Sequence, residues 1–198
     1  MSEHIFEAEY DEEGVWVYQA FRPDIAEPAV ESQSFEDTPF DIHRMTWIKP
    51  SFAWMLYRSK YGTKHNQECI LKIKVAHQVM ASLLNICKCK DGGGGSFGRV
   101  QWDPARDLYS QESKKHKIPR KKLRDRTIQI GLKEKLNQLY TSGILEIKDV
   151  TELAHAVSIA HQSKNCGEQL KLLDLPNEKQ YIPHCSKEVL TRLQIKHD

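Results

Sequence analysis

The chain has no long hydrophobic segment and no targeting pattern at its start. No apolar run in its 198 residues approaches the roughly 20 residues that a membrane-spanning helix needs. The opening residues, MSEHIFEAEYDEEG, are acidic and lack the basic-then-apolar order of a secretory signal. These two absences predict an intracellular protein, cytoplasmic or nuclear, with no membrane partner.

The cysteines form neither a disulfide framework nor a recognisable metal site. Five is an odd number and their spacing is irregular, so we expect reduced thiols. Cys87 and Cys89 are too close in sequence for a zinc knuckle or a redox Cys-x-x-Cys pair, and no second ligand pair has suitable spacing. The nine histidines are scattered along the chain. The sequence therefore predicts no bound metal.

Glycine is concentrated in one segment, Asp91–Gly98, which lacks the pattern of a phosphate-binding loop. No Lys-Ser or Lys-Thr pair follows it, and it contains no GxGxxG sequence. We expect a flexible connector here. The missing fingerprint also argues against a doubly wound nucleotide-binding fold.

Charge is distributed unevenly along the chain. Residues 1–41 contain 12 of the 27 Asp and Glu residues but only one of the 29 Lys and Arg residues, Arg22. The remaining residues therefore carry 28 cations against 15 carboxylates, a net charge of +13. A basic body favours a phosphate-bearing partner, either a nucleotide or a nucleic acid. The alternative is that the acidic segment folds back and neutralises the body.

Short segments with strand and helix periodicity alternate along the chain. Strands are predicted at Val15–Phe21, Met45–Ile48, Cys69–Ala76, Arg99–Asp103, Thr127–Ile130 and Ile144–Val150. Helices are predicted at 23–30, 51–60, Gln78–Cys87, Leu132–Thr141 and Glu152–Gln162, with Pro50 in the first turn of the second and Thr151 capping the last. This order predicts an α+β domain of small mixed sheets with flanking helices over residues 15–162. An acidic leader (1–14) precedes it and a C-terminal extension (163–198) follows.

The segment Met45–Lys64 combines aromatic and basic side chains at unusual density. It holds two tryptophans, Phe52, two tyrosines, Arg58 and three lysines. A strand that enters a helix through Lys49-Pro50-Ser51 can hold an anionic ligand, because backbone N–H groups at a helix start attract anions. The segment therefore predicts a binding site.

A second basic segment, Lys114–Arg126, holds eight Lys and Arg in thirteen residues. Such a run is typical of a solvated loop. Its functional alternatives are contact with a phosphate backbone or a localisation signal. Because it contains no aromatic residue, we expect ionic contact rather than base stacking.

Four sequence segments resemble one uncharacterised family. They are VYQAFRPDIAEPAV (Val17–Val30), RMTWIKPSFAWMLYRSKYGTK (Arg44–Lys64), VQWDPARDL (Val100–Leu108) and RTIQIGL (Arg126–Leu132). The family is catalogued as domain of unknown function 4291, and the resemblance covers roughly Val15 to Val157. Its name implies no activity.

The order of elements is also similar to that of ADP-ribosyltransferase-like domains, especially those that modify DNA. That resemblance implies an NAD-binding cleft between two small sheets and transfer of ADP-ribose to a nucleic acid or a protein. The matching positions are Gln19 on the first strand, Thr46 and Trp47 on the second with Ser51, and Arg126 with Gln129 late in the chain. Gln129 departs from the family, where a glutamate stabilises the oxocarbenium-like transition state. Either another carboxylate replaces this glutamate, with Asp103 as the best candidate, or the domain binds a nucleotide without this chemistry.

The resemblance implies a role for each candidate. Gln19 and Arg22 would contact the adenosine-side ribose and phosphates, Trp47 the nicotinamide, and Gln129 the other ribose. Lys49, Ser51 and Arg58 would bind phosphate, and Arg126 would orient the site; the catalytic set is Gln129, Asp103 and Arg126. The candidate cofactor-binding residues are Gln19, Arg22, Arg44, Thr46, Trp47, Lys49, Ser51, Trp54 and Arg58.

Each candidate also has a structural interpretation. Trp54 has the helical spacing of a core residue, Ser51 of an N-terminal cap, and Asp103 of an Asx residue before the turn that Pro104 opens. Arg22 and Arg44 would then pair with the acidic leader. Two other functions stay open, namely a non-catalytic nucleic-acid-binding module that uses residues 114–126 and a partner-binding scaffold without a small-molecule site.

Overall fold

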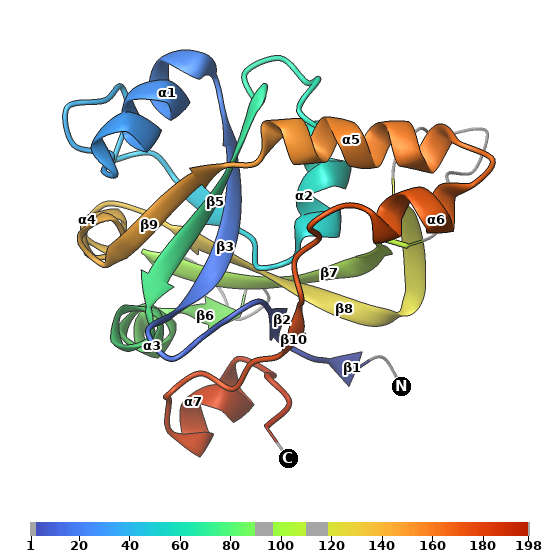
Figure 1. The fold of residues 1–198 in the computed structure, drawn as a ribbon. Coiled ribbons are helices and arrows are strands. Elements are labelled where there is room, and N and C mark those ends of the chain that lie inside the picture. Colours follow the sequence, from blue (N-terminus) through green and yellow to red (C-terminus); the bar gives the residue numbers. More distant parts are fainter. Residues whose placement is uncertain (1–2, 90–96, 110–118, 198) are drawn as a thin grey trace.

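The computed structural model describes residues 3–89, 97–109 and 119–197. In these residues seven helices flank three small sheets, which confirms the predicted α+β class (Figure 1). The predicted connector lies outside the described residues except for residues 97 and 98, and so does the first part of the basic segment, residues 114–118.

One sheet has three antiparallel strands in the order β3 (Gly14–Phe21), β5 (Cys69–Ala76) and β9 (Ile144–Asp149). Its strands lie within one residue of the sequence prediction, because β-branched and aromatic residues mark β3 and apolar residues alternate with lysines in β5. Val15 and Val17 pair with Val75 and Ile73 and point into the main core. Gln19, two residues further along β3, lies on this same face.

The second of the two larger sheets has five strands and is organised around the long strand β8 (Arg120–Leu132). On one side β8 pairs with β7 (Gly98–Asp107), and on the other with β1 (Glu3–His4) and β4 (Thr46–Ile48) at different heights. The short strand β6 (Lys88–Cys89) adds to the outer edge of β7. The two large sheets meet where Tyr18 and Lys49 exchange backbone hydrogen bonds of 2.7 and 3.2 Å.

Three predicted boundaries in this sheet are wrong. The strand predicted at Thr127–Ile130 begins seven residues earlier, at Arg120, so residues 120–126 of the basic segment belong to a strand and not to a loop. The strand does not give way to a helix at Gly131, because Leu132 is still paired with Thr46 on one side and Gly98 on the other. The helix that follows, α4, spans Lys135–Ser142. Strand β7 also continues through Pro104, where a register shift before Arg106 accommodates the missing N–H.

The remaining elements cover these sheets. They are α1 (Pro23–Ser32), α2 (Phe52–Ser59), α3 (His77–Ile86), α5 (Thr151–Gln162), α6 (Cys166–Lys171), α7 (Lys187–Arg192) and a small sheet of β2 (Glu7–Ala8) with β10 (Lys179–Gln180). Pro50 precedes the capping residue of α2 and so lies outside its first turn. The Thr151 hydroxyl does not cap α5 but accepts a 2.9 Å hydrogen bond from the Ile70 amide, which joins α5 to β5.

The segment after residue 162 packs against the rest of the chain. Tyr181, Leu190 and Leu193 are buried in the same cluster as the inward residues of β3. The two ends of the chain lie at the same side of the molecule, where the Lys196 amide donates to the His4 carbonyl at 3.0 Å (Figure 1). None of the helices in the described ranges has the length and apolar character that a membrane span requires.

Candidate ligand-binding site

A cavity of about 960 Å³ opens between the two large sheets. Its walls come from β3, β4, β7, β8 and α2, together with the loops after β3 and before β4. Its volume lies at the upper end of the range of small-molecule sites. Ten of the twelve predicted site residues line it, namely Gln19, Arg22, Arg44, Thr46, Trp47, Lys49, Trp54, Arg58, Asp103 and Gln129.

The other two predicted residues, Ser51 and Arg126, are not among the residues that line this cavity. Ser51 caps α2, where its hydroxyl accepts a 3.4 Å hydrogen bond from the Trp54 amide. Arg126 is three residues from Gln129 on the same strand, so its side chain leaves the opposite face. It pairs in register with His4, and its charge together with burial lowers the pKa of that histidine.

The start of α2, which the sequence suggested as an anion site, is already occupied by a carboxyl group of the chain itself. The Phe52 amide donates a 2.6 Å hydrogen bond to Oε1 of Glu178. Burial, reinforced by Glu7 and Glu9, raises the pKa of this carboxyl to about 8. Sequence reasoning missed Glu178 because 126 residues separate it from its partner.

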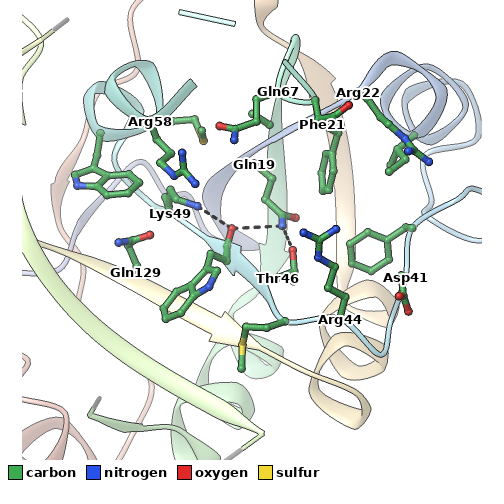
Figure 2. A pocket seen from close by; sticks show the side chains of 18 of the residues that line it. Gln19, Phe21, Arg22, Asp41, Arg44, Thr46, Lys49, Arg58, Gln67 and Gln129 are labelled. Atoms are coloured by element: carbon green, nitrogen blue, oxygen red, sulfur yellow. Dashed lines mark hydrogen bonds between the residues drawn. The ribbon is translucent and has the colours of Figure 1, made fainter. Parts of the chain in front are cut away.

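The side chain of Gln19 links β3 to α4 and to β4 through hydrogen bonds. Its side-chain oxygen accepts a 2.8 Å hydrogen bond from the Tyr140 hydroxyl on α4. Its amide nitrogen donates to the Thr46 hydroxyl at 2.7 Å and to the Trp47 carbonyl at 3.4 Å (Figure 2). Because its hydrogen-bonding groups are used inside the protein, Gln19 fixes β4 against β3 and leaves ligand contact to its neighbours.

The Trp47 indole lies directly on the neighbouring strand. It is paired in register with Gly131, and a Cβ atom added at Gly131 would come within 2.9 Å of the ring. Glycine at this position therefore allows the close approach. Trp54 lines the cavity from α2 and packs edge-on against Tyr57 with 5.8 Å between ring centroids.

Asp103 and Gln129 are brought together on adjacent strands. The Asp103 carboxylate accepts hydrogen bonds from the side-chain amides of Gln129 and Gln101, the latter at 2.8 Å. The predicted Asx turn at Asp103 is wrong, since β7 continues past this residue. Gln129 points away from the buried Ile128 and Ile130, as the alternation of the strand predicted. A carboxylate held by two amides thus faces the cavity.

Lys49 is a buried cation without an anionic partner. Only 7 % of the residue is exposed, and its ammonium donates to the Trp47 carbonyl at 3.1 Å and lies 5.5 Å from the centre of the Trp54 ring. No carboxylate among the described residues comes within ion-pair distance of it. Burial, with a smaller contribution from Arg58, lowers the pKa of Lys49 to about 7, and Asp103 opposes this shift.

Three arginines stand around the cavity. Arg22 pairs with Asp24 in the first turn of α1 at 2.7 Å. Arg44 and Arg58 are exposed and form no ion pair with any carboxylate in the described part of the chain. Asn137, which is fully buried, donates to the carbonyls of Ile42 and Arg44 at 2.7 and 2.9 Å and so holds the loop that carries Arg44.

Sequence reasoning also missed an aromatic wall. Phe21 and Phe40 line the cavity, and both pack against Phe35, with 5.3 and 4.8 Å between ring centroids. The position of Phe21 at the end of a predicted strand, directly before Arg22, was the signal that could have found it. Phe40 lies in a loop without periodicity and gave no such signal.

The acidic leader (1–14) neutralises part of the basic body on the side away from the cavity. Lys72 pairs with Glu9 at 2.8 Å, and Lys74 pairs with Asp11 at 2.7 Å and with Glu13 at 2.6 Å. All these contacts lie on the face of the three-stranded sheet opposite Gln19.

Comparison with known proteins gives a family. No curated protein matches the chain. The family model described as "Domain of unknown function (DUF4291)" matches residues 5–181, which is most of the chain and includes every residue of the cavity. The chain therefore belongs to the DUF4291 family.

Proposed function

We propose that the cavity binds NAD and that the protein is an ADP-ribosyltransferase-like enzyme. The observation that carries this proposal is the convergence of β3, β4 and β8 on one cavity. The candidate residues Gln19, Thr46 with Trp47, and Gln129 lie on these three strands, and they meet beside two arginines without carboxylate partners. Guanidinium groups of this kind match the geometry of phosphates.

The two ends of the cavity suit the two halves of a dinucleotide. At one end Phe21 lies near Arg22 and Arg44, and at the other end Lys49 lies near Arg58 and Gln129 (Figure 2). Each end thus combines cations with ring systems, since Phe40 packs against Phe21 and the Trp54 ring lies 5.5 Å from the Lys49 amine. Bases stack on such rings while phosphates pair with the cations.

Asp103 would supply the charge that Gln129 lacks. Cleavage of the nicotinamide–ribose bond places positive charge on the ribose, and a fixed carboxylate stabilises that charge. In this proposal Gln129 and Gln101 position Asp103 through their amides. The Gln129 oxygen remains free to accept from a ribose hydroxyl, because the amide nitrogen makes the contact with Asp103.

Calorimetric titration with NAD at low salt tests the proposal. We expect saturable binding that weakens by about 10- to 100-fold in Arg58→Ala and in Arg44→Ala, since a charge-assisted hydrogen bond contributes about 1.5–3 kcal/mol. Arg124→Ala is the matched control, because Arg124 is an exposed arginine outside the cavity. A flat trace at millimolar NAD, or equal loss in all three variants, would contradict the proposal.

The basic segment would meet the macromolecular acceptor. Of its eight cations, five belong to β8, namely Arg120, Lys121, Lys122, Arg124 and Arg126, and Lys122 pairs with Asp125 at 3.6 Å. If the protein is instead a non-catalytic nucleic-acid-binding module, deletion of residues 114–118 should weaken binding to single-stranded DNA. Binding should also fall steeply with added salt, because counterions are released at each phosphate contact. Under the transferase proposal, in contrast, the same deletion should leave NAD binding unchanged, because the described residues that line the cavity lie elsewhere in the chain.

A further inference from the structure

The buried amine of Lys49 is surrounded by few hydrogen-bond acceptors and by no carboxylate within ion-pair distance among the described residues. The side chain enters the cavity between β4 and α2, and one backbone carbonyl, that of Trp47, accepts from it at 3.1 Å. An ammonium group has three protons to donate, so this arrangement leaves donors unused at a site that is 93 % buried. A neutral amine, which needs fewer acceptors and offers a lone pair, fits this environment better.

The charges around Lys49 also favour the neutral amine. Arg58 stands beside it on the same side of the cavity (Figure 2), and Asp103, a carboxylate that lines the same cavity, is held by two glutamine amides. The pKa of Lys49 is accordingly lowered to about 7 by burial and by Arg58, so that about half of the amines are unprotonated at neutral pH. Desolvation next to a second cation is a known way to make a lysine nucleophilic.

The guanidinium of Arg58 is placed to hold an anionic group on the molecule that reaches Lys49. Arg58 makes no ion pair with the described carboxylates, and it lines the same cavity. A compound that brings both a carbonyl group and a phosphate would therefore meet an amine and a guanidinium together.

We propose that Lys49 is a Schiff-base lysine that captures an aldehyde bearing a phosphate group, with Arg58 binding the phosphate. The amine nitrogen attacks the carbonyl carbon, and a proton moves from nitrogen to oxygen to give a carbinolamine. The carbon–oxygen bond then breaks as a C=N bond forms, and one water molecule leaves. No oxidant or reductant takes part, and the reaction does not depend on NAD.

Borohydride trapping with pyridoxal 5′-phosphate tests this proposal on the wild-type protein. The imine is reduced to a stable secondary amine, and peptide mapping locates it. We expect Lys49 to be labelled at least about tenfold faster than the exposed Lys171, because burial beside Arg58 lowers the pKa of Lys49 and so favours its nucleophilic amine. The ion-paired Lys74, which is buried to the same degree, is the matched control and should react slowest.

Two variants separate the roles of the amine and the guanidinium. Lys49→Met should abolish the fast adduct. In Arg58→Gln, the rate with pyridoxal phosphate relative to pyridoxal, which has no phosphate, should fall about tenfold. Arg124→Gln should leave this ratio unchanged. Since Lys49 is compared with Lys171 inside the wild-type protein, the result does not depend on whether the variants fold.

Labelling of Lys49 no faster than that of Lys171 would overturn the proposal, and so would a rate ratio that Arg58→Gln leaves unchanged. Trapping without NAD binding would leave Lys49 as a carbonyl site and remove the transferase proposal. NAD binding without trapping would remove the Schiff-base proposal and leave the transferase proposal standing.

Discussion

Buried lysines have opposite electrostatic surroundings on the three-stranded sheet and in the cavity. On the outer face Lys74, 6 % exposed, lies 5.8 Å from the centre of the Trp16 ring and pairs with two carboxylates of the N-terminal segment. At the cavity Lys49, 7 % exposed, lies near Trp54 and has no carboxylate partner among the described residues. The pKa of Lys74 is raised by its partners, whereas burial lowers that of Lys49.

This difference between paired and unpaired lysines indicates where the protein would bind an anionic ligand. The chain neutralises the outer face with its own Glu9, Asp11 and Glu13, so that surface is electrostatically complete. The start of α2 is also satisfied from within the chain, because the Glu178 carboxyl accepts a hydrogen bond from the Phe52 amide. The cavity keeps unpaired cations at a cost in stability, and such sites are where function is expected.

The largest effect is expected at Glu178. Its carboxyl has a pKa of about 8 in the folded protein against 4.5 for a free glutamate, so the unfolded chain releases the proton first as pH rises. Stability should therefore fall between pH 4.5 and 8, by at most about 5 kcal/mol, and should level off above. Glu178→Gln should flatten this dependence. Urea unfolding at several pH values measures it, and an unchanged slope in the variant would show that another group titrates.

Replacement of each of the two lysines by methionine should change the free energy of unfolding at pH 7 in opposite directions. Lys49→Met should stabilise the protein by about 2 kcal/mol, because it removes a buried charge without a partner. Lys74→Met should destabilise it by about 1 kcal/mol, because two partly exposed carboxylates lose their cation. For wild-type Lys49 the unfolded chain binds the proton more tightly, so stability should rise between pH 7 and 10.5. Destabilisation of similar size in both variants would break the comparison.

The smallest effect is expected at Glu13. Its side chain is 75 % exposed, and Lys74 keeps Asp11 as a second partner. Glu13→Gln should therefore cost no more than about 0.5 kcal/mol at low salt and nothing measurable at 1 M salt. Chemical denaturation in urea at both salt concentrations measures this difference. A larger or salt-independent loss would mean that Glu13 supports the fold in another way.

Local patterns predicted the elements well where neighbours in sequence decide the outcome. The alternation of Val15–Phe21 gave β3, and the Gly14–Phe21 strand of the structure differs by one residue. Predicted boundaries were wrong where pairing with another strand determines the end of an element. Leu132, for example, stays in the sheet because it pairs with Thr46 and Gly98. The prediction that Thr151 caps α5 failed for a similar reason, because its hydroxyl accepts a hydrogen bond from the Ile70 amide of β5.

The site was predicted as a set of residues, but their roles depended on partners distant in sequence. Aromatic and basic density singled out Trp47, Lys49 and Arg58, which do line the cavity. No pattern indicated that Tyr140 would saturate Gln19, that Asn137 would hold the Arg44 loop, or that Glu178 would cap α2. These partners lie 93 to 126 residues away from the groups they contact.

The sequence by itself determined the α+β class, the positions of most strands and the separation of an acidic start from a basic body. Side-chain periodicity and net charge are local or additive properties, and the order of residues fixes them. Only the tertiary structure decided which cations the acidic segment neutralises and which it leaves in the cavity. That choice depends on the face of β5 to which Lys74 points and on the crossing of β3 and β4 at Lys49, because ion pairs form only between groups a few ångströms apart.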